Sequence, residues 1–280
     1  MMTTTLRPTG PIQQGADGAR IRVYDVCDNG RPVGAVEIGT DPEFGATAGV
    51  LRSLRIDEPN RRRGRGTIAA LAAEEVLRGW GCSRLALSVE PDNTAGQRLA
   101  AALGYTERSK NMIKDLPQIP PDLPDGVTGR PMTPEEFAQW ESSAITGYAE
   151  TWIARGVPEV EAMRKAEISH RTYLPHGLAT EGAQLHALVH EDDGAVGHVW
   201  VSRFEMHPGT VVGYVFDVEV REDFRGRGFG RALMLEAERI ALDAGHERIG
   251  LHVLSSNTPA VRLYESLGYE ATRYNLVKAL

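Results

Sequence analysis

Apolar positions in the first half of the chain follow two periods, which predict two kinds of element. Segments rich in β-branched and other apolar residues predict strands over 21–26, 33–38, 50–56 and 85–89. Apolar residues at helical spacing predict a helix over 67–78 and a second helix from Asn93-Thr94 to Leu103-Gly104. Residues 1–19 show neither period, so we expect a flexible leader there.

The second half begins with a long helical pattern and then shows strand-like and helix-like segments similar to those of the first half. Thr133-Pro134-Glu135-Glu136 has the form of a capping box with proline at the first helical position, which predicts a helix from there to Gly156. Apolar spacing predicts a second helix over 158–173 and a later one that begins near Arg231. The predicted strands of this half cover 185–190, 196–204, 212–220, 249–254 and a closing stretch at 274–278.

The two halves are copies of one pattern. Adding 164 to the numbering lays residues 61–105 on 225–269 without a gap and gives 18 identities in 45 positions. The same shift carries Lys114 onto Lys278, so the last predicted strands also correspond. Because agreement of this extent is hard to reach by chance, the chain is predicted to contain the same fold twice.

A proline-rich segment separates the copies. Residues 117–126 contain four prolines, which exclude a central strand and favour a semi-rigid linker. The predicted domains are therefore 20–116 and 127–280. About 58 residues precede the first common strand of the second copy, against about 20 in the first, so the N-terminal copy is a truncated version.

A tight glycine turn follows the strand predicted over 212–220. Arg225, Gly228 and Gly230 form the pattern R-x-x-G-x-G directly before a helix, and Arg61, Gly64 and Gly66 repeat it in the first copy. Such a turn directs several unpaired backbone N–H groups to one spot, which suits a phosphate or diphosphate. The glycine spacing excludes the dinucleotide fingerprint, and the lack of a lysine excludes the nucleoside-triphosphate loop.

A second motif lies some 32 residues after the glycine turn. Asn257, Ala260, Tyr264, Gly268 and Tyr269 complete the pattern N-x-x-A-x-x-x-Y-x-x-x-G-[FY]. Together the two motifs resemble those of the GNAT (GCN5-related) N-acetyltransferases, and the resemblance covers both copies. It implies an α/β (α+β) chain of two tandem GNAT folds, each a mixed, splayed β-sheet flanked by helices. The sheet of the second copy would be splayed between the strands at 212–220 and 249–254.

The resemblance also implies acetyl-CoA as co-substrate and direct transfer of its acetyl group to a primary amine of a small molecule or peptide. Backbone amides from Arg227 to Arg231 would hold the diphosphate, and the strand carrying Val218 and Val220 would pair with the pantetheine. Asn257 is expected to contact the pantetheine or to end the strand ahead of a helix cap at Thr258. The implied coenzyme-binding residues are Val218, Val220, Arg225, Gly226, Arg227, Gly228, Phe229, Gly230, Arg231 and Asn257.

Two residues of the second copy have implied catalytic roles. Tyr264 lies where the family's general acid protonates the departing thiolate, and a phenol with an ordinary pKa of about 10 suits that task. His252 occupies the position that carries glutamate in ribosomal-protein alanine N-acetyltransferases, so it is a candidate base. A purely structural role, as a strand histidine that forms a hydrogen bond for packing, is an equally good interpretation of His252. Glu219 and Asp217 are alternative bases, and the sequence leaves the choice open.

The first copy lacks these catalytic groups. Ala100 stands at the position of Tyr264, and Ser88 stands at the position of His252. We therefore expect an active C-terminal domain and a structural N-terminal domain, whose ability to bind coenzyme A stays open. The alternative function is a non-catalytic acyl-CoA-binding or scaffold protein.

Charge and composition limit the other partners. The net charge of -7 argues against nucleic-acid binding, and an excess of 23 acidic over 15 basic residues after residue 123 is compatible with a cationic amine. No apolar segment approaches the length that spans a membrane, and the polar residues 1–15 lead us to expect no signal peptide. Two cysteines, Cys27 and Cys82, fit a reducing compartment, so a cytoplasmic protein is expected.

The sequence also gives expectations for metal binding and for oligomeric state. All eight histidines lie in the second half, but their spacing matches no metal site, so no metal is expected. The chain is expected to be a monomer whose copies form an intrachain pseudo-dimer, or a homodimer.

Overall fold

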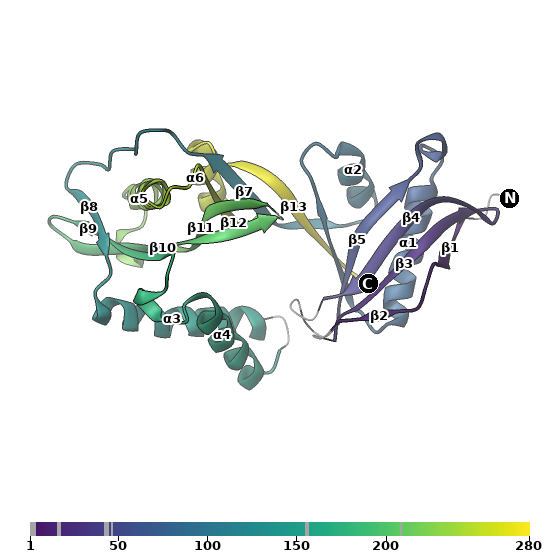
Figure 1. Ribbon diagram of the computed structural model, residues 1–280, viewed down its shortest axis with the longest axis horizontal. Coiled ribbons are helices and arrows are strands. Elements are labelled where there is room, and N and C mark those ends of the chain that lie inside the picture. Colours follow the sequence, from purple (N-terminus) through teal and green to yellow (C-terminus); the bar gives the residue numbers. More distant parts are fainter. Residues whose placement is uncertain (1–3, 16–17, 42–44, 46, 155–156, 208) are drawn as a thin grey trace. The chain divides into compact units, whose positions relative to one another are not determined.

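A computed structural model describes residues 4–15, 18–41, 45, 47–154, 157–207 and 209–280 (Figure 1). The chain forms two compact units, and these do not follow the sequence copies. Unit 1 contains the chain up to Lys110 together with Leu254–Ser256 and Thr272–Leu280. Unit 2 contains Asn111–Val253 and Asn257–Ala271. The end of each copy is thus built into the unit that contains most of the other copy.

Unit 1 is a twisted sheet with the long helix α1 packed against it. Its strands follow the order β1-β3-β4-β5-β6-β13, and β2 pairs with β3. The elements are β1 (Thr4–Pro8), β2 (Gln13–Gln14), β3 (Arg20–Asp28), β4 (Arg31–Thr40), β5 (Ala48–Ile56), a 3-10 helix (Glu58–Asn60), α1 (Arg65–Gly79), β6 (Arg84–Val89) and α2 (Thr94–Ala102).

The expectation of a flexible leader is wrong for Thr4–Pro8. These residues form β1 and pair antiparallel with β3 along their whole length. Backbone hydrogen bonds therefore order the segment, while Leu6 packs on the core of the unit. The segment has one apolar side chain, so it lacks the alternation that identifies a strand in the sequence.

Unit 2 is a sheet with helices on both faces. Figure 1 shows α5 and α6 on one face of this sheet and α3 and α4 on the other. The strand order is β7-β12-β11-β10-β9-β8. The elements are β7 (Thr106–Asp115), β8 (Val127–Pro131), α3 (Pro134–Ile153), α4 (Glu159–Tyr173), η3 (Gly177–Ala179), β9 (Ala183–His190), β10 (Gly194–His207), β11 (Thr210–Val220), η4 (Glu222–Phe224), α5 (Phe229–Asp243), β12 (Arg248–Leu254) and α6 (Thr258–Ser266). The last strand of the chain, β13 (Glu270–Ala279), joins the sheet of unit 1.

The helix that opens unit 2 begins as the sequence predicts. Thr133 and Glu136 form the reciprocal hydrogen bonds of a capping box. Both guanidinium nitrogens of Arg130 also donate to Glu136, each at 2.7 Å, which ties the first turn of α3 to β8. The predicted end of this helix at Gly156 lies outside the described residues. The helix α4 ends at Tyr173, as predicted.

The last strands of the two copies are exchanged. The strand β13 ends the second copy, yet it pairs antiparallel with β6 of the first copy, with Tyr274 opposite Val89 and Ala279 opposite Arg84. Conversely, β7 ends the first copy and lies next to β12 in the strand order. Each sheet is therefore completed by a strand from the other copy.

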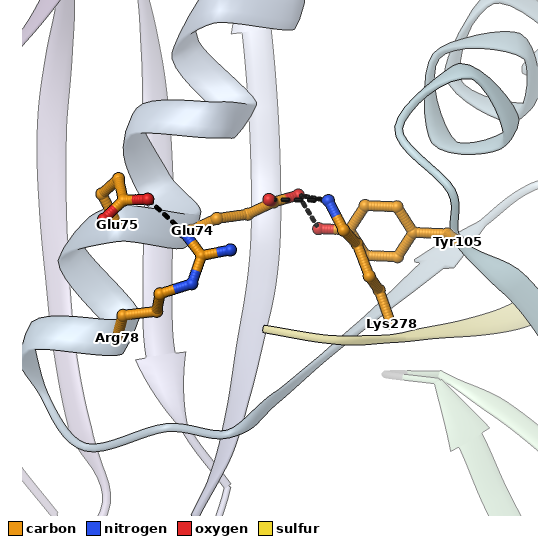
Figure 2. Close-up of polar contacts among 5 residues, drawn as sticks. All are labelled: Glu74, Glu75, Arg78, Tyr105 and Lys278. Atoms are coloured by element: carbon orange, nitrogen blue, oxygen red, sulfur yellow. Dashed lines mark hydrogen bonds and ion pairs between the residues drawn. The ribbon is translucent and has the colours of Figure 1, made fainter.

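A buried carboxylate binds the exchanged strand in each unit. In unit 1, Glu74 of α1 accepts hydrogen bonds from Lys278 of β13, at 2.7 and 2.9 Å, and from the hydroxyl of Tyr105 at 3.0 Å (Figure 2). In unit 2, Glu238 of α5 accepts a hydrogen bond of 2.6 Å from Lys114 of β7. Both glutamates are 1% exposed, so each lysine neutralises a charge that water does not reach.

The sheet of unit 2 separates between β11 and β12, as the splayed fold requires. The two strands pair in parallel only from Gly213 opposite Ile249 to Val215 opposite Leu251. Directly after this point Phe216 is the extra residue of a β-bulge against β10, because Trp200 faces Asp217 and Val201 faces Val215. A bulge bends its strand and increases its twist, so β11 diverges from β12 beyond Val215.

Candidate active site

The glycine turn places a helix N-terminus at one end of the separated strands. Gly226 and Gly228 have φ values of +78° and +88°, and Gly228 is the N-cap of α5. Residues other than glycine rarely adopt this left-handed conformation, which explains the glycines at both positions. At position 230 glycine is favoured by close packing, since a Cβ there would lie 3.3 Å from Cδ2 of Leu263 in α6. The N-terminus of a helix leaves backbone N–H groups without an acceptor and favours anions, although the amide of Arg231 already donates to the carbonyl of Gly228 at 3.0 Å.

The arginines of the turn are held by neighbouring groups. Arg225 donates from Nε to the carbonyl of Val220 at 3.2 Å. Arg227 forms an ion pair of 2.6 Å with Asp193, and Arg231 donates to the hydroxyl of Ser266 at 2.6 Å. These contacts fix the turn and bring positive charge to it.

The predicted acid, Tyr264, lies in α6 and belongs to the core of unit 2. Its side chain is 7% exposed, and its ring centroid is 5.9 Å from that of Tyr269. Burial, and secondarily the negative charge of Asp217, raise the pKa of Tyr264. The phenol therefore keeps its proton at neutral pH.

A cavity of about 940 Å³ opens on the opposite face of the sheet, beside α3 and α4. Its walls combine aromatic rings with carboxylates. The lining residues that matter chemically are Trp140, His170, Tyr173, His198, Trp200, Phe216, Asp217, Glu219 and Arg221. The bulge at Phe216 brings both Phe216 and Asp217 to this cavity, although consecutive strand residues normally point to opposite faces.

Asp217 is the centre of a polar network in the cavity. Its Oδ2 accepts a hydrogen bond of 2.7 Å from the indole N–H of Trp140 and lies 3.0 Å from Nε2 of His198. Burial alone would raise the pKa of Asp217. The hydrogen bond and positive charge of His198, with the hydrogen bonds from Trp140 and the amide of Val218, outweigh it and lower the pKa. Asp217 is therefore ionised at neutral pH.

The remaining predicted catalytic residues lie in different surroundings. Glu219 lines the cavity and is paired with Arg225 at 3.3 Å. His252 of β12 is exposed and is not among the residues that line the cavity. The structure thus brings Glu219 and Asp217 to the cavity, while Tyr264 lies in the core beside Tyr269. The catalytic roles of Tyr264 and His252 stay predictions.

Asn257 is itself the cap of α6. Its side-chain oxygen accepts from the amide of Ala260 at 3.3 Å, so the expectation of a cap at Thr258 is wrong by one residue. Thr258 is instead the first helical residue, because Asn257 and the proline at position 259 together form the helix start. A contact of Asn257 with pantetheine stays a prediction.

Sequence reasoning missed Trp140, His170 and His198 as site residues. Trp140 and His170 lie on the helices expected to form the acceptor wall, but helical spacing alone does not separate an aromatic residue of the core from one of a cavity. His198 lies on β10, outside both motifs. Only the pairing of β10 with β11 could have identified it as a site residue, because this pairing places His198 opposite Glu219 and close to Asp217.

The described residues contain neither a candidate membrane span nor a candidate metal cluster. No helix of this part of the chain is long and apolar enough to cross a membrane. No three side chains of histidine, cysteine, aspartate or glutamate gather there in a way that could hold a metal ion.

Comparisons with known proteins agree with the two motifs. The sequence profile of the acetyltransferase (GNAT) family matches residues 6–105 and 146–269. A mycothiol acetyltransferase of Saccharomonospora viridis is 27% identical over 95% of this chain and 85% of its own length. An uncharacterized N-acetyltransferase of Bacillus subtilis, YdgE, is 27% identical over 53% of this chain and 95% of its own length.

Solved structures show a similar fold over both copies. A GCN5-related N-acetyltransferase from Sphaerobacter thermophilus has a TM-score of 0.57 and 21% identity, covering 92% of this chain and 80% of that one. A tandem GNAT protein from the clavulanic acid biosynthesis pathway has a TM-score of 0.50 and 19% identity, covering 95% of this chain and 85% of that one. The tandem arrangement predicted from the internal repeat is thereby confirmed as a known architecture.

Proposed function

Because the chain belongs to the acetyltransferase (GNAT) family, we propose that its C-terminal copy transfers the acetyl group of acetyl-CoA directly to a primary amine. The proposed catalytic domain is 127–280, the linker is 117–126, and the domain at 20–116 is structural. The acceptor is a small molecule or the α-amine of a peptide. The free cysteines Cys27 and Cys82 fit a reducing cytoplasm.

The observation that carries this proposal is the position of the strand separation. Strands β11 and β12 stop pairing after Val215, beside the bulge that turns Asp217 into the cavity. The N-terminus of α5 begins nine residues beyond Val220, and Val218 and Val220 pack against the core that contains Tyr264. A coenzyme whose diphosphate binds at α5 and whose arm enters the separation would bring its thioester between Tyr264 and the cavity.

The coenzyme is proposed to bind mainly through backbone groups. Amides from Arg227 to Arg231 would donate to the diphosphate, with positive charge from Arg225. The backbone of Val218 and Val220, which β12 does not pair, would hydrogen-bond the pantetheine and the thioester carbonyl. Asn257 would contact the arm from the start of α6.

Tyr264 is proposed to protonate the sulfur as the thiolate leaves. Its raised pKa keeps the proton on the phenol until the basic thiolate forms. Glu219, His252 and Asp217 are the bases considered from the sequence. Of these, Glu219 and Asp217 line the cavity where an amine would bind.

Release of free coenzyme A thiol from acetyl-CoA, measured with the full chain and a panel of amines, tests the proposal. The panel should contain aliphatic and aromatic amines, short peptides and the unacetylated form of mycothiol, since that relative carries the name mycothiol acetyltransferase. We expect amine-dependent thiol release and an acetylated product by mass spectrometry. Tight binding of coenzyme A without turnover for any amine would instead support a non-catalytic acyl-CoA-binding protein.

A further inference from the structure

The cavity also indicates how the amine is recognised and which residue takes its proton. Resting on the acetyl transfer proposed for this copy, we propose that Asp217 binds the acceptor as its ammonium ion and that His198, held by Asp217, is the base. The aromatic walls would hold a flat apolar group attached to that amine. The substrate class is therefore a primary amine on an aromatic or similarly flat body.

Asp217 has the properties of an ammonium site. It is ionised, it faces a cavity lined by rings, and its hydrogen bonds from Trp140 and His198 fix the orientation of the carboxylate. A fixed carboxylate binds a cation more strongly than a mobile one, because less side-chain freedom is lost on binding. Asp217 is also followed directly by Val218, which packs against the core that contains the proposed acid Tyr264.

Continuous aromatic walls lie next to this carboxylate. The ring centroid of Trp200 is 5.6 Å from that of Trp140 and 4.7 Å from that of Phe216, and Phe216 is 4.9 Å from Tyr173. The indole N–H groups of both tryptophans are used, by Asp217 and by Ser202. The polar indole edges are thus not available to a ligand, and the parts of these rings that line the cavity favour a flat apolar body or a cation.

His198 suits the role of base because of its partner. When Nε2–H of a neutral imidazole donates to Asp217, the lone pair lies on Nδ1 and can accept a proton. The imidazolium that forms is stabilised by the ionised carboxylate at 3.0 Å. His170 is a poorer base, because burial lowers its pKa and its Nδ1 is buried without a hydrogen-bond partner among the described residues.

Charged and titratable groups on several elements face the cavity that His198 lines. Asp217, Glu219 and Arg221 face the cavity from β11, and Glu136 faces it from α3 with its charge offset by Arg130. The helix α4 contributes His170 and the phenol of Tyr173. On β9 the residue opposite His198 is Ala187, which carries no charge. Asp217 is therefore the dominant partner for the proton on His198.

The proton balance of the step is complete. The ammonium gives one proton to His198, which passes it to water, and the neutral amine attacks the thioester carbonyl carbon. A C–N bond forms, the C–S bond breaks, and Tyr264 protonates the sulfur. The amide nitrogen then loses its second proton, which restores the phenol of Tyr264 through water. One proton is released overall for each acetyl group transferred.

The pH dependence of kcat/KM tests the role of His198. We expect the wild-type profile to rise through a histidine-like pKa, and His198→Gln to lower kcat/KM about 100-fold and remove that limb. The matched control is His176→Gln, an exposed histidine outside the cavity, which should keep the wild-type profile. Partial rescue of His198→Ala by added imidazole is also expected. An unchanged pH profile in a folded His198→Gln protein overturns the proposal.

Asp217→Asn gives a second, independent readout. Loss of the negative charge should increase KM for the amine, because the ammonium ion loses its counter-ion. Coenzyme A affinity, measured by calorimetry, should stay unchanged. An unchanged KM for the amine in a folded Asp217→Asn protein would contradict the assignment of Asp217 as the ammonium site.

Amine specificity tests the aromatic walls. Phenylethylamine should have a kcat/KM at least about tenfold above that of ethylamine or putrescine, and Phe216→Ala should reduce this preference. Faster acetylation of ethylamine or putrescine overturns the assigned substrate class while leaving acetyl transfer intact. Failure of every amine in the wild-type protein would instead contradict the proposed function itself.

Discussion

The two copies contain the same β-bulge but place different side chains on it. In the first copy Arg52 is the extra residue, since Glu37 faces Ser53 and Ile38 faces Leu51. Adding 164 to Arg52 gives Phe216, the extra residue of the second copy. The backbone that aims residues into a cavity is therefore common to both copies, while the chemistry is not.

The side chains on the two bulged strands differ in charge and shape. Ser53 stands where Asp217 binds Trp140 and His198, and Arg55 stands where Glu219 lines the cavity. The strand pairs also align Ala35 with His198, because Ala35 lies opposite Arg55 as His198 lies opposite Glu219. The first copy thus has neither the carboxylate nor the imidazole proposed to bind and deprotonate an amine.

The glycine turns differ in the same way. Gly64 caps α1 with φ +75° as Gly228 caps α5 with φ +88°, but Arg62 adopts φ +61° at the position of Gly226. The first residue of α1 is Arg65, whose buried side chain pairs with Asp28. A repeated backbone can keep its turns and bulges while the residues needed for chemistry are lost from one copy.

The largest expected effect is on kcat, and it comes from changing the proposed general acid of the second copy and the equivalent position of the first. Tyr264→Phe should lower kcat about 10²–10⁴-fold, because no other group is proposed to protonate the sulfur. Ala100→Tyr alters the equivalent position of the first copy and should leave kcat within about twofold, although overpacking of a 3% exposed site should cost about 1–3 kcal/mol of stability. Steady-state rates with a reactive amine give the comparison. Full activity of Tyr264→Phe would show that the second copy is not the catalytic one.

The next effect concerns the exchanged strands and should be similar in both units. Lys278→Met and Lys114→Met each leave a buried glutamate without its cation, so each should reduce the free energy of unfolding by about 3 kcal/mol. Arg171→Met breaks an exposed pair with Glu167 and should cost less than about 1 kcal/mol. Urea unfolding of the three variants measures this difference. Equal small losses for all three would indicate that the buried pairs do not hold the strands.

The glycine caps provide a smaller test of which copy binds the coenzyme. Gly228→Ala and Gly64→Ala each force a left-handed residue to carry a Cβ and should cost about 1–2 kcal/mol of stability. Only Gly228→Ala should weaken coenzyme A binding measured by calorimetry. Equal weakening by both substitutions would assign a second coenzyme site to the first copy.

Arg62→Gly should have the smallest effect and the opposite sign. Glycine tolerates φ +61°, so removing the side chain relieves steric strain, partly offset by the entropy of a more flexible unfolded chain. The net gain in stability should be at most about 1 kcal/mol. Thermal unfolding measures it, with Arg63→Gly as the control. A loss of stability in Arg62→Gly would mean that its guanidinium makes a compensating contact.

The internal repeat made most of the architecture predictable from the sequence. The motifs and glycine turns depend on local residue types, so their positions agree with the structure to within a few residues. The separation of β11 from β12 was implied by the family resemblance. The strand exchange was not predictable for a physical reason. Lys114 and Lys278 are equivalent in the repeat, as are Glu74 and Glu238, so either lysine satisfies either glutamate.

The cavity was only partly predictable. Asp217 and Glu219 lie on a strand next to the motif, and both were identified as candidate bases. Trp140 and His198 approach Asp217 from α3 and β10, and these contacts depend on tertiary packing and on the bulge. A pattern of apolar and polar positions does not encode either contact.

A crystal structure of the full chain with coenzyme A tests the central claim most directly. The account predicts the diphosphate at the amides of Arg227–Arg231, the pantetheine between β11 and β12, and the sulfur within reach of the Tyr264 hydroxyl. Coenzyme bound only at the Arg61–Gly66 turn, or bound with its sulfur far from Tyr264, would contradict it.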